Sequence, residues 1–201
     1  MVVKVGDLTV LTDPGGWTTK QNEVKGVDVV LITHEHPDHL HIESVKEILR
    51  NNPSAKIFTV SSVNKLLQKE GLKAEILSHG RSVTEKNILI EGFGKEHADI
   101  YPGIPKVENV GYFIANNFFY PGDAFTNPRK HVEILALPLG GPWMNIGQSI
   151  DYAKEIKPKI AIPVHDGMLG IRGPYDIHPK KFLGEAGIDF KVLKAGESID
   201  L

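Results

Sequence analysis

The segment that most constrains the fold of this chain is an apolar run, VDVVLIT at 27–33, that leads directly into HEHPDH at 34–39. The run is rich in β-branched residues and follows Gly26, which is typical of a strand buried on both faces. Pro37 has no amide hydrogen, and its ring pushes the preceding residue toward an extended conformation. We therefore expect a buried strand that ends in a loop crowded with imidazoles and carboxylates.

The spacing within this loop suits two metal ions. In an extended segment, residues two apart point the same way, so His34 and His36 can reach one ion. Asp38 and His39, beyond the proline, can turn toward a second. Imidazole and carboxylate ligands together suit zinc, iron, manganese and other divalent ions. Solvated loop histidines are the alternative, but four such residues within six are hard to explain in that way, and Glu35 should point away from the ligands.

Strand-like and helix-like segments follow one another in three blocks. The first half alternates strand and helix after a hairpin that turns at Gly6-Asp7, the middle is rich in hairpins, and the last third alternates again. This order predicts an α+β fold with two mixed sheets and helices on their outer faces, in a single domain spanning residues 1–201. The expected strands lie at 2–5, 8–13, 27–33, 55–60, 88–94, 131–139, 159–165 and 190–196, with a hairpin over 110–125 turning at Asn116-Asn117, and the expected helices at 42–52, 61–71, 147–158 and 178–187.

Composition excludes several classes of protein. The formal net charge is -2 and the sequence pI is near 6.5, which is a poor electrostatic match for long nucleic acid. The chain has no cysteine, so neither a disulfide framework nor a thiolate metal ligand is available. The N-terminus MVVKVGDLTV does not resemble a signal peptide, and the apolar runs fall far short of the about 20 residues of a membrane span. We expect a cytoplasmic protein that binds no membrane.

Three residues far along the chain stand in the same kind of position as the histidine loop. His97 follows a strand and precedes a loop rich in proline and glycine, Asp123 lies at a strand end in YPGDAF, and His165 ends the apolar strand KIAIPVH. Loops at the mouth of a sheet commonly carry chemistry. These residues are therefore candidates to complete the site that begins at 34–39.

HEHPDH resembles the H-x-H-x-D-H signature of the metallo-β-lactamase superfamily, and a distal His, an Asp in a Gly-Asp turn and a final His follow in that family's order. The segments TDPGG (12–16), YPGDAF (120–125) and IPVHDG (162–167) also resemble the family, so the resemblance covers nearly the whole chain. The most similar branch is that of short, lactonase-like hydrolases similar to the ascorbate-6-phosphate lactonases. The resemblance implies a four-layer αββα sandwich with a two-metal site on one edge.

The resemblance also implies the role of each ligand. A first ion would take His34, His36 and His97. A second would take Asp38, His39 and His165, and Asp123 would bridge the two ions. Such ions, with zinc expected first and manganese or iron as alternatives, can deprotonate a shared water and polarise a carbonyl or phosphoryl oxygen. Asp38 and Asp123 are therefore expected to be catalytic as well as metal-binding.

The sequence leaves the roles of several other residues open. Asp13 in TDPGG could accept a hydrogen bond from a ligand imidazole, as could Thr33, or Asp13 could be a plain turn residue. Trp143 could wall a pocket or pack beneath its loop. A cation such as Arg172 beside His165 would favour a phosphate or carboxylate substrate. The remaining histidines are expected to be bystanders: His41 at the start of helix 42–52, His79 in a turn, His131 at the start of a strand and His178 at the start of a helix.

We therefore expect a metal-dependent hydrolase that opens a lactone, ester or phosphodiester of a small molecule, with an anionic substrate favoured, by attack of a metal-bound hydroxide. A phosphodiesterase acting on a cyclic nucleotide or an RNA end is the nearest alternative, because the same metals serve both reactions. A non-catalytic metal-binding module is the alternative from another class. The sequence is compatible with a homo-oligomer.

Overall fold

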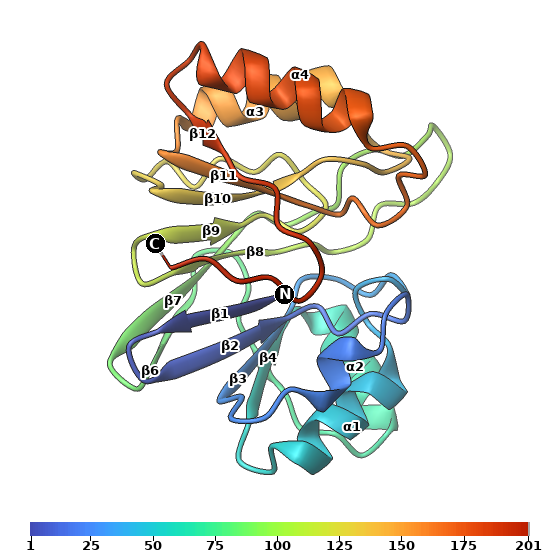
Figure 1. Ribbon diagram of the computed structural model, residues 1–201. Coiled ribbons are helices and arrows are strands. Elements are labelled where there is room, and N and C mark those ends of the chain that lie inside the picture. The colour runs from blue at the N-terminus through green and yellow to red at the C-terminus, as the bar shows by residue number, and fades with distance from the viewer. Residues whose placement is uncertain (201) are drawn as a thin grey trace.

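A computed structural model describes residues 1–200 and contains two β-sheets packed against each other, each with two helices on its outer face (Figure 1). One core cluster fills the space between the sheets and extends to the first pair of helices. A second lies between the other sheet and the second pair. The four layers are helix, sheet, sheet and helix, which confirms the predicted αββα sandwich. No helix within residues 1–200 is long and apolar enough to cross a membrane.

The first sheet has five strands in the order of the chain: β1 (Val2–Val5), β2 (Leu8–Thr12), β3 (Val29–Ile32), β4 (Lys56–Thr59) and β5 (Glu75–Ile76). Strands β1 and β2 form the predicted antiparallel hairpin, and β2 to β5 are parallel. Parallel strands need crossover connections, which here are a short 3-10 helix (Lys20–Glu23), α1 (Ile42–Asn51) and α2 (Ser61–Lys69). Every residue of β3 is buried, as its apolar sequence predicts.

The second sheet has seven strands in the order β12-β11-β10-β9-β8-β7-β6. The run from β6 to β9 is an antiparallel meander, and β9 to β12 are parallel. The helices α3 (Ile146–Ile156) and α4 (Gly173–Gly184) supply the crossovers from β10 to β11 and from β11 to β12, and they cover this sheet. A loop joins β9 to β10. The strands are β6 (Ser82–Glu85), β7 (Ile88–Phe93), β8 (Gly111–Ile114), β9 (Phe118–Tyr120), β10 (Ile134–Pro138), β11 (Ile160–Val164) and β12 (Asp189–Phe190).

This topology brings loops from both sheets to one edge of the sandwich. The carboxyl ends of β2 and β3 in one sheet, and of β9, β10 and β11 in the other, all face that edge. The loops that leave these strands gather at the right of Figure 1. Because parallel strands release their chains at the same edge, residues more than a hundred positions apart can meet there.

Several predicted boundaries were wrong. Strand β10 begins at Ile134 and not at 131, so His131 precedes the strand instead of opening it. The helix predicted at 178–187 begins at Gly173, so His178 lies within α4 instead of opening it, and Pro179 lies inside the helix. The hairpin between β8 and β9 has its left-handed residues at Ala115 and Asn116, one position earlier than predicted. The last strand covers only two residues because pairing with β11 stops after Phe190. In each case tertiary pairing, which a local pattern does not encode, decides the boundary.

Candidate metal centre

The loop after β3 folds against the glycine-rich segment after β2. The amide of Gly16 donates to the Pro37 carbonyl at 2.8 Å, and the amide of His41 donates to the Pro14 carbonyl at 3.0 Å. Between these bonds the two backbones touch so closely that a Cβ at Gly15 would lie 1.7 Å from the Asp38 carbonyl oxygen. The TDPGG segment is thus a backbone cradle that any side chain at Gly15 would disrupt.

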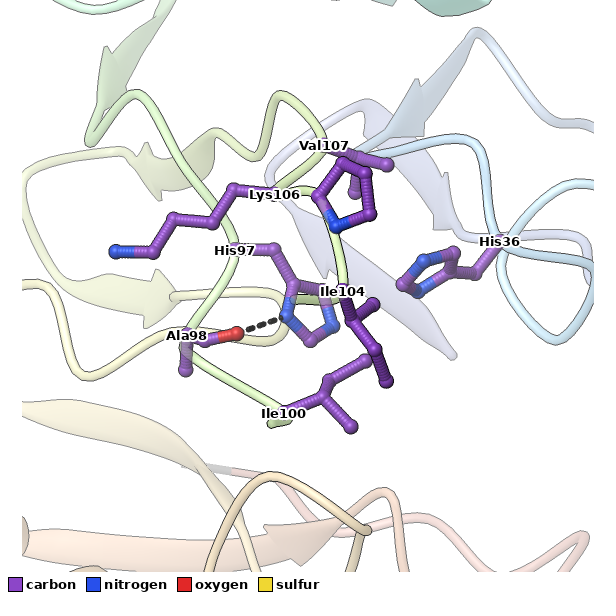
Figure 2. A pocket seen from close by; sticks show the side chains of 8 residues that line it. His36, His97, Ala98, Ile100, Ile104, Lys106 and Val107 are labelled. Atoms are coloured by element: carbon purple, nitrogen blue, oxygen red, sulfur yellow. Dashed lines mark hydrogen bonds between the residues drawn. The ribbon is translucent and has the colours of Figure 1, made fainter. Parts of the chain in front are cut away.

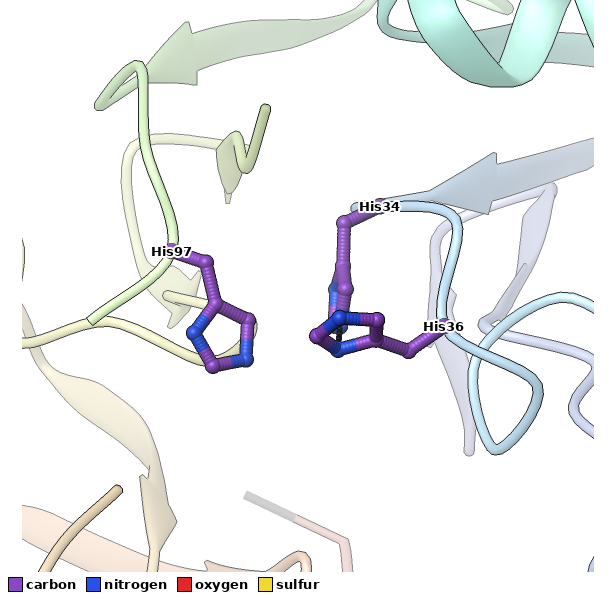
Figure 3. A group of neighbouring side chains, drawn as sticks. All are labelled: His34, His36 and His97. Atoms are coloured by element: carbon purple, nitrogen blue, oxygen red, sulfur yellow. Dashed lines mark hydrogen bonds between the residues drawn. The ribbon is translucent and has the colours of Figure 1, made fainter. Parts of the chain in front are cut away.

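Three histidines form the first of two ligand groups (Figure 3). One ring nitrogen from each of His34, His36 and His97 lies within 4.8 Å of the others. The closest approach, 3.1 Å, joins His34 Nε2 and His36 Nδ1. His97 comes from the β7–β8 loop and so reaches the group from the opposite sheet. We call His34, His36 and His97 the imidazole group.

The outer nitrogens of this group are held by oxygen atoms. His97 Nδ1 donates to the Ala98 carbonyl at 2.6 Å. His34 Nδ1 lies 3.0 Å from Thr33 Oγ1, which itself donates to Asp13, so His34 must donate to Thr33. Burial lowers the pKa of His34 well below its usual range, and the neighbouring His39 lowers it further. Burial also lowers the pKa of His36. His34 is therefore neutral, and its Nε2 faces the rest of the group.

Two carboxylates and two histidines form the other group, within 4.8 Å of one another: Asp38, His39, Asp123 and His165. His165 Nε2 lies 3.2 Å from Asp38 Oδ2 and 3.1 Å from Asp123 Oδ2. Asp123 also approaches the imidazole group, because its Oδ2 lies 3.4 Å from His97 Nε2. We call these four residues the mixed group, and Asp123 is the member that touches both.

Two atoms at the centre of the mixed group are left without hydrogen bonds. Asp123 Oδ1 and His39 Nε2 are buried 3.2 Å apart, and neither has a hydrogen-bond partner among the described residues. An unsatisfied buried carboxylate oxygen costs free energy of about 1–3 kcal/mol or more, because it has lost its water. A divalent cation between the two atoms would satisfy both, and all-His/Asp donors suit zinc, manganese and iron. The residues therefore fit a metal.

Asp13 orients the mixed group from behind, which settles its role against that of a plain turn residue. Its Oδ2 accepts from His39 Nδ1 at 2.7 Å, from Thr33 Oγ1 at 2.8 Å and from the Tyr120 hydroxyl at 2.6 Å. The first bond leaves His39 Nε2 as the nitrogen that faces the ligands. Burial alone would raise the pKa of Asp13, but His39 outweighs it and holds that pKa below its usual value. Asp13 is thus a buried carboxylate that fixes the tautomer of His39.

Trp143 and Gly140 hold the other side of the mixed group. Trp143 is buried beneath its loop, as one of its two readings predicts, and its Nε1 donates to Asp123 Oδ2 at 2.9 Å. His165 has a left-handed backbone with φ of 56°, and its Nδ1 donates to the Gly140 carbonyl. Each ligand histidine whose outer ring nitrogen donates to a neighbouring oxygen therefore presents its other ring nitrogen to the site.

Two supporting residues have no clear signal in the sequence. Tyr120 reaches Asp13 across 107 positions of the chain. Asn109 accepts from the amide of Asp123 at 3.0 Å and donates to the Pro121 carbonyl at 3.0 Å, so it fixes the turn that carries Asp123. A Cβ at Gly122 would lie 2.4 Å from Asn109 Oδ1. The Gly-Asp pair therefore requires glycine for both space and its φ of 65°.

Other candidate residues lie outside both ligand groups. Arg172 binds the carboxylates of Asp166 and Asp176, so its charge is paired within its own loop and helix. His41 precedes α1, where its Nδ1 lies 2.9 Å from Ser44 Oγ. His79 accepts from the Gly94 amide at 3.2 Å and lines a separate cavity of about 250 Å³. Glu35 belongs to neither ligand group. His131 is paired with Glu133 at the surface.

Comparison with known proteins places these features in a family. A family model described as "Beta-lactamase superfamily domain" matches residues 1–165. The chain is similar to Protein Rv0786c of Mycobacterium tuberculosis, with 29% identity over 87% of this chain and 84% of that protein. It is similar to metal-dependent hydrolase Ta0764 of Thermoplasma acidophilum, with 28% identity over 77% and 72% of the two chains. The structure resembles that of the metallo-beta-lactamase fold protein YhfI of Bacillus subtilis, with a TM-score of 0.70, 16% identity, and coverage of 98% and 88%.

Proposed function

The chain belongs to the beta-lactamase superfamily and is a metal-dependent hydrolase, and we propose that it hydrolyses a lactone, ester or phosphodiester bond of a small molecule at a two-metal site. The proposal places one ion on the imidazole group and one on the mixed group. Zinc is the first choice for both, with manganese and iron as alternatives. Two such ions would supply a Lewis acid and would lower the pKa of a bound water.

The observation that carries the proposal is the position of Asp123. Its carboxylate lies within 3.4 Å of His97 in one ligand group and within 3.1 Å of His165 in the other, and its outer contact is the Trp143 indole. A carboxylate shared by two groups of ligands is suited to hold two cations at a fixed separation. Asp38 lies opposite it across His165 and offers a second carboxylate that can bind a cation or hold a proton.

The protein residues around the site orient the ligands and exclude water behind them. Asp13, Thr33 and Tyr120 form a buried network that holds His39 in place. No serine or cysteine nucleophile is needed, and the chain contains no cysteine. The lactonase-like assignment and the small-molecule substrate are part of the proposal. An anionic group on that substrate would be met by the ions, because the guanidinium of Arg172 is already paired.

Two alternatives remain distinct from this proposal. A phosphodiesterase acting on a cyclic nucleotide or RNA end would use the same ligands, so only substrates separate it from a lactonase. A non-catalytic metal-binding module would keep the metal but hydrolyse nothing. The formal net charge of -2 favours a small substrate over long nucleic acid.

The experiment measures metal content and hydrolysis together. Elemental analysis of purified protein should find close to two divalent ions per chain, and a panel of lactones, esters and phosphodiesters should contain at least one substrate. Asp123→Ala should lose metal and activity. Asp151→Ala, which removes an exposed carboxylate on α3, is the matched control and should retain both. Full metal content in Asp123→Ala would refute the assigned site, and a fully metallated protein inert on the whole panel would favour the non-catalytic module.

A further inference from the structure

Large apolar side chains are exposed on the loops that surround the metal centre. Within residues 1–200, eleven large apolar side chains are exposed, and five of them lie on loops next to the ligands: Trp17, Tyr101, Ile104, Met168 and Ile171. Single exposed apolar residues are ordinary on a protein surface, but a concentration around a cleft commonly marks a binding surface. The position of these residues therefore indicates a binding surface next to the metal centre.

Trp17 stands beside the mixed group. Its side chain is 63% exposed, and its ring centroid lies 6.5 Å from that of His165. It follows Gly15 and Gly16, whose backbone packs against the ligand loop, so its position relative to the metal centre is fixed by that contact. An exposed indole held in this way offers an apolar face at the edge of the site and is not stabilised by packing in the core.

Ile100 and Ile104 stand beside the imidazole group (Figure 2). Together with His36 and His97 they line a small cavity of about 10 Å³, enough for roughly one water. Ile104 is 50% exposed, so the cavity wall continues outward as an apolar surface. We call Trp17, Ile100 and Ile104 the apolar rim, because they flank the two ligand groups from two different loops.

Two cations near the rim, Lys106 and Arg172, are already paired. Lys106 also lines the small cavity, but its Nζ lies 3.1 Å from Asp99 Oδ1 and 3.7 Å from Glu96 Oε2. Arg172 is held between Asp166 and Asp176. With these charges matched locally, the groups that the two loops offer to a ligand beside the metals are mainly apolar.

We propose that the apolar rim binds the acyl chain of the substrate, so that the substrate is an ester or lactone with an alkyl chain next to the carbonyl that the metal centre attacks. This inference rests on the proposed function and names the substrate class of the same site. The chain lies along Ile104 or Trp17 while the carbonyl oxygen lies at the ligand groups. Burial of each methylene strengthens binding by up to about fourfold, and by about twofold when burial is half complete.

The test uses hydroxamic acids, which bind a metal through one end and vary in the length of the other. Affinities of acetohydroxamate, butyrohydroxamate and octanohydroxamate for the metal-loaded protein are measured by calorimetry, which needs no turnover. We expect a gain of about twofold per methylene, and at least about tenfold from the shortest to the longest acid. Ile104→Ala and Trp17→Ala should flatten this dependence and leave the affinity for acetohydroxamate unchanged.

Ile177→Ala is the matched control, since it removes a side chain 65% exposed on α4 that is not part of the rim. It should keep the full dependence on chain length. Equal affinity of wild type for all three acids, or the same dependence in the rim variants, overturns the acyl-chain proposal alone. Failure of even acetohydroxamate to bind the loaded protein overturns the two-metal function as well. A rim variant that changes sedimentation but not the chain-length dependence assigns the rim to contact between copies, against the proposal.

Discussion

The two ligand groups meet at one carboxylate but differ in charge. The imidazole group contains no carboxylate, and the outer nitrogens of His34 and His97 face uncharged oxygens of Thr33 and Ala98. The mixed group contains two carboxylates, and its His39 is backed by a third, that of Asp13. A cation is stabilised more strongly where negative charge is concentrated in a site of low dielectric. We therefore expect the mixed group to hold its ion more tightly, and the imidazole group to depend on the shared Asp123 for negative charge.

The largest effect is expected from removing one histidine of either group. His97→Ala should leave about one ion per chain after desalting, bound by the mixed group, whereas His165→Ala should leave less than one. Both should lower kcat/KM by about 10³-fold or more, a loss of about 4 kcal/mol of transition-state stabilisation. Elemental analysis and steady-state kinetics measure the two quantities. If His165→Ala retains more metal than His97→Ala, the mixed group does not hold its ion more tightly than the imidazole group.

The ligands from the two sheets, which are divided between both groups, differ in how far they could be predicted from sequence. The ligands from the first sheet lie in one six-residue segment, 34–39, just after β3, so the strand and its extended loop place them by local rules. Those from the second sheet come singly from three loops, after β7, β9 and β11. Local patterns predicted that each ends a strand. Only the order of residues in a family could assign them to one site, because their meeting depends on strand order.

The supporting residues show where sequence reasoning ends. From sequence, Asp13 could equally be an acceptor for a ligand imidazole or a plain turn residue. Its partners Thr33, His39 and Tyr120 lie 20, 26 and 107 positions away, so no local pattern connects them. The fold layers were predictable since alternation of strands and helices determines them. The start of α4 was not, because a proline at 179 predicts a boundary that tertiary packing overrides.

The next largest effect tests the support behind the mixed group. Asp13→Asn removes the charge that holds His39 and leaves fewer acceptors for its four donors, one of which is the backbone amide of Thr33. We expect affinity for the ion of the mixed group to fall about 10–100-fold, as is typical of a residue that orients a ligand. Affinity for the other ion should fall less, because Asp13 reaches His34 only through Thr33. Competition with a chelator measures this. Asp28→Asn is the control, since Asp28 likewise accepts from a backbone amide, that of Thr9, but belongs to neither ligand group. Equal loss of both ions would contradict the separation of the two groups.

A smaller effect is expected at Trp143, which touches the carboxylate that the groups share. Trp143→Phe keeps the aromatic packing against Phe125 but removes the N–H that donates to Asp123. A hydrogen bond to a charged group contributes about 1.5–3 kcal/mol, so metal affinity should fall about tenfold, for both ions alike. Tyr152→Phe, which loses a buried hydroxyl bond to the Thr126 carbonyl, is the control and should lower stability without changing metal affinity. Loss of only one ion from Trp143→Phe would mean that Asp123 serves one group.

The smallest effect is expected at Glu35. It tests whether a carboxylate near the ligands strengthens metal binding even when its side chain points away from them. Glu35 lies between His34 and His36 in sequence, yet it is half-buried and belongs to neither ligand group. In an extended segment its side chain points opposite to its neighbours. Glu35→Gln should therefore change metal content and kcat/KM by less than about twofold, near the about 0.5 kcal/mol of an ordinary surface substitution. A tenfold loss of metal from the imidazole group would show that this carboxylate supplies negative charge which the three ligand residues lack. The difference between the two groups would then be smaller than their ligands indicate.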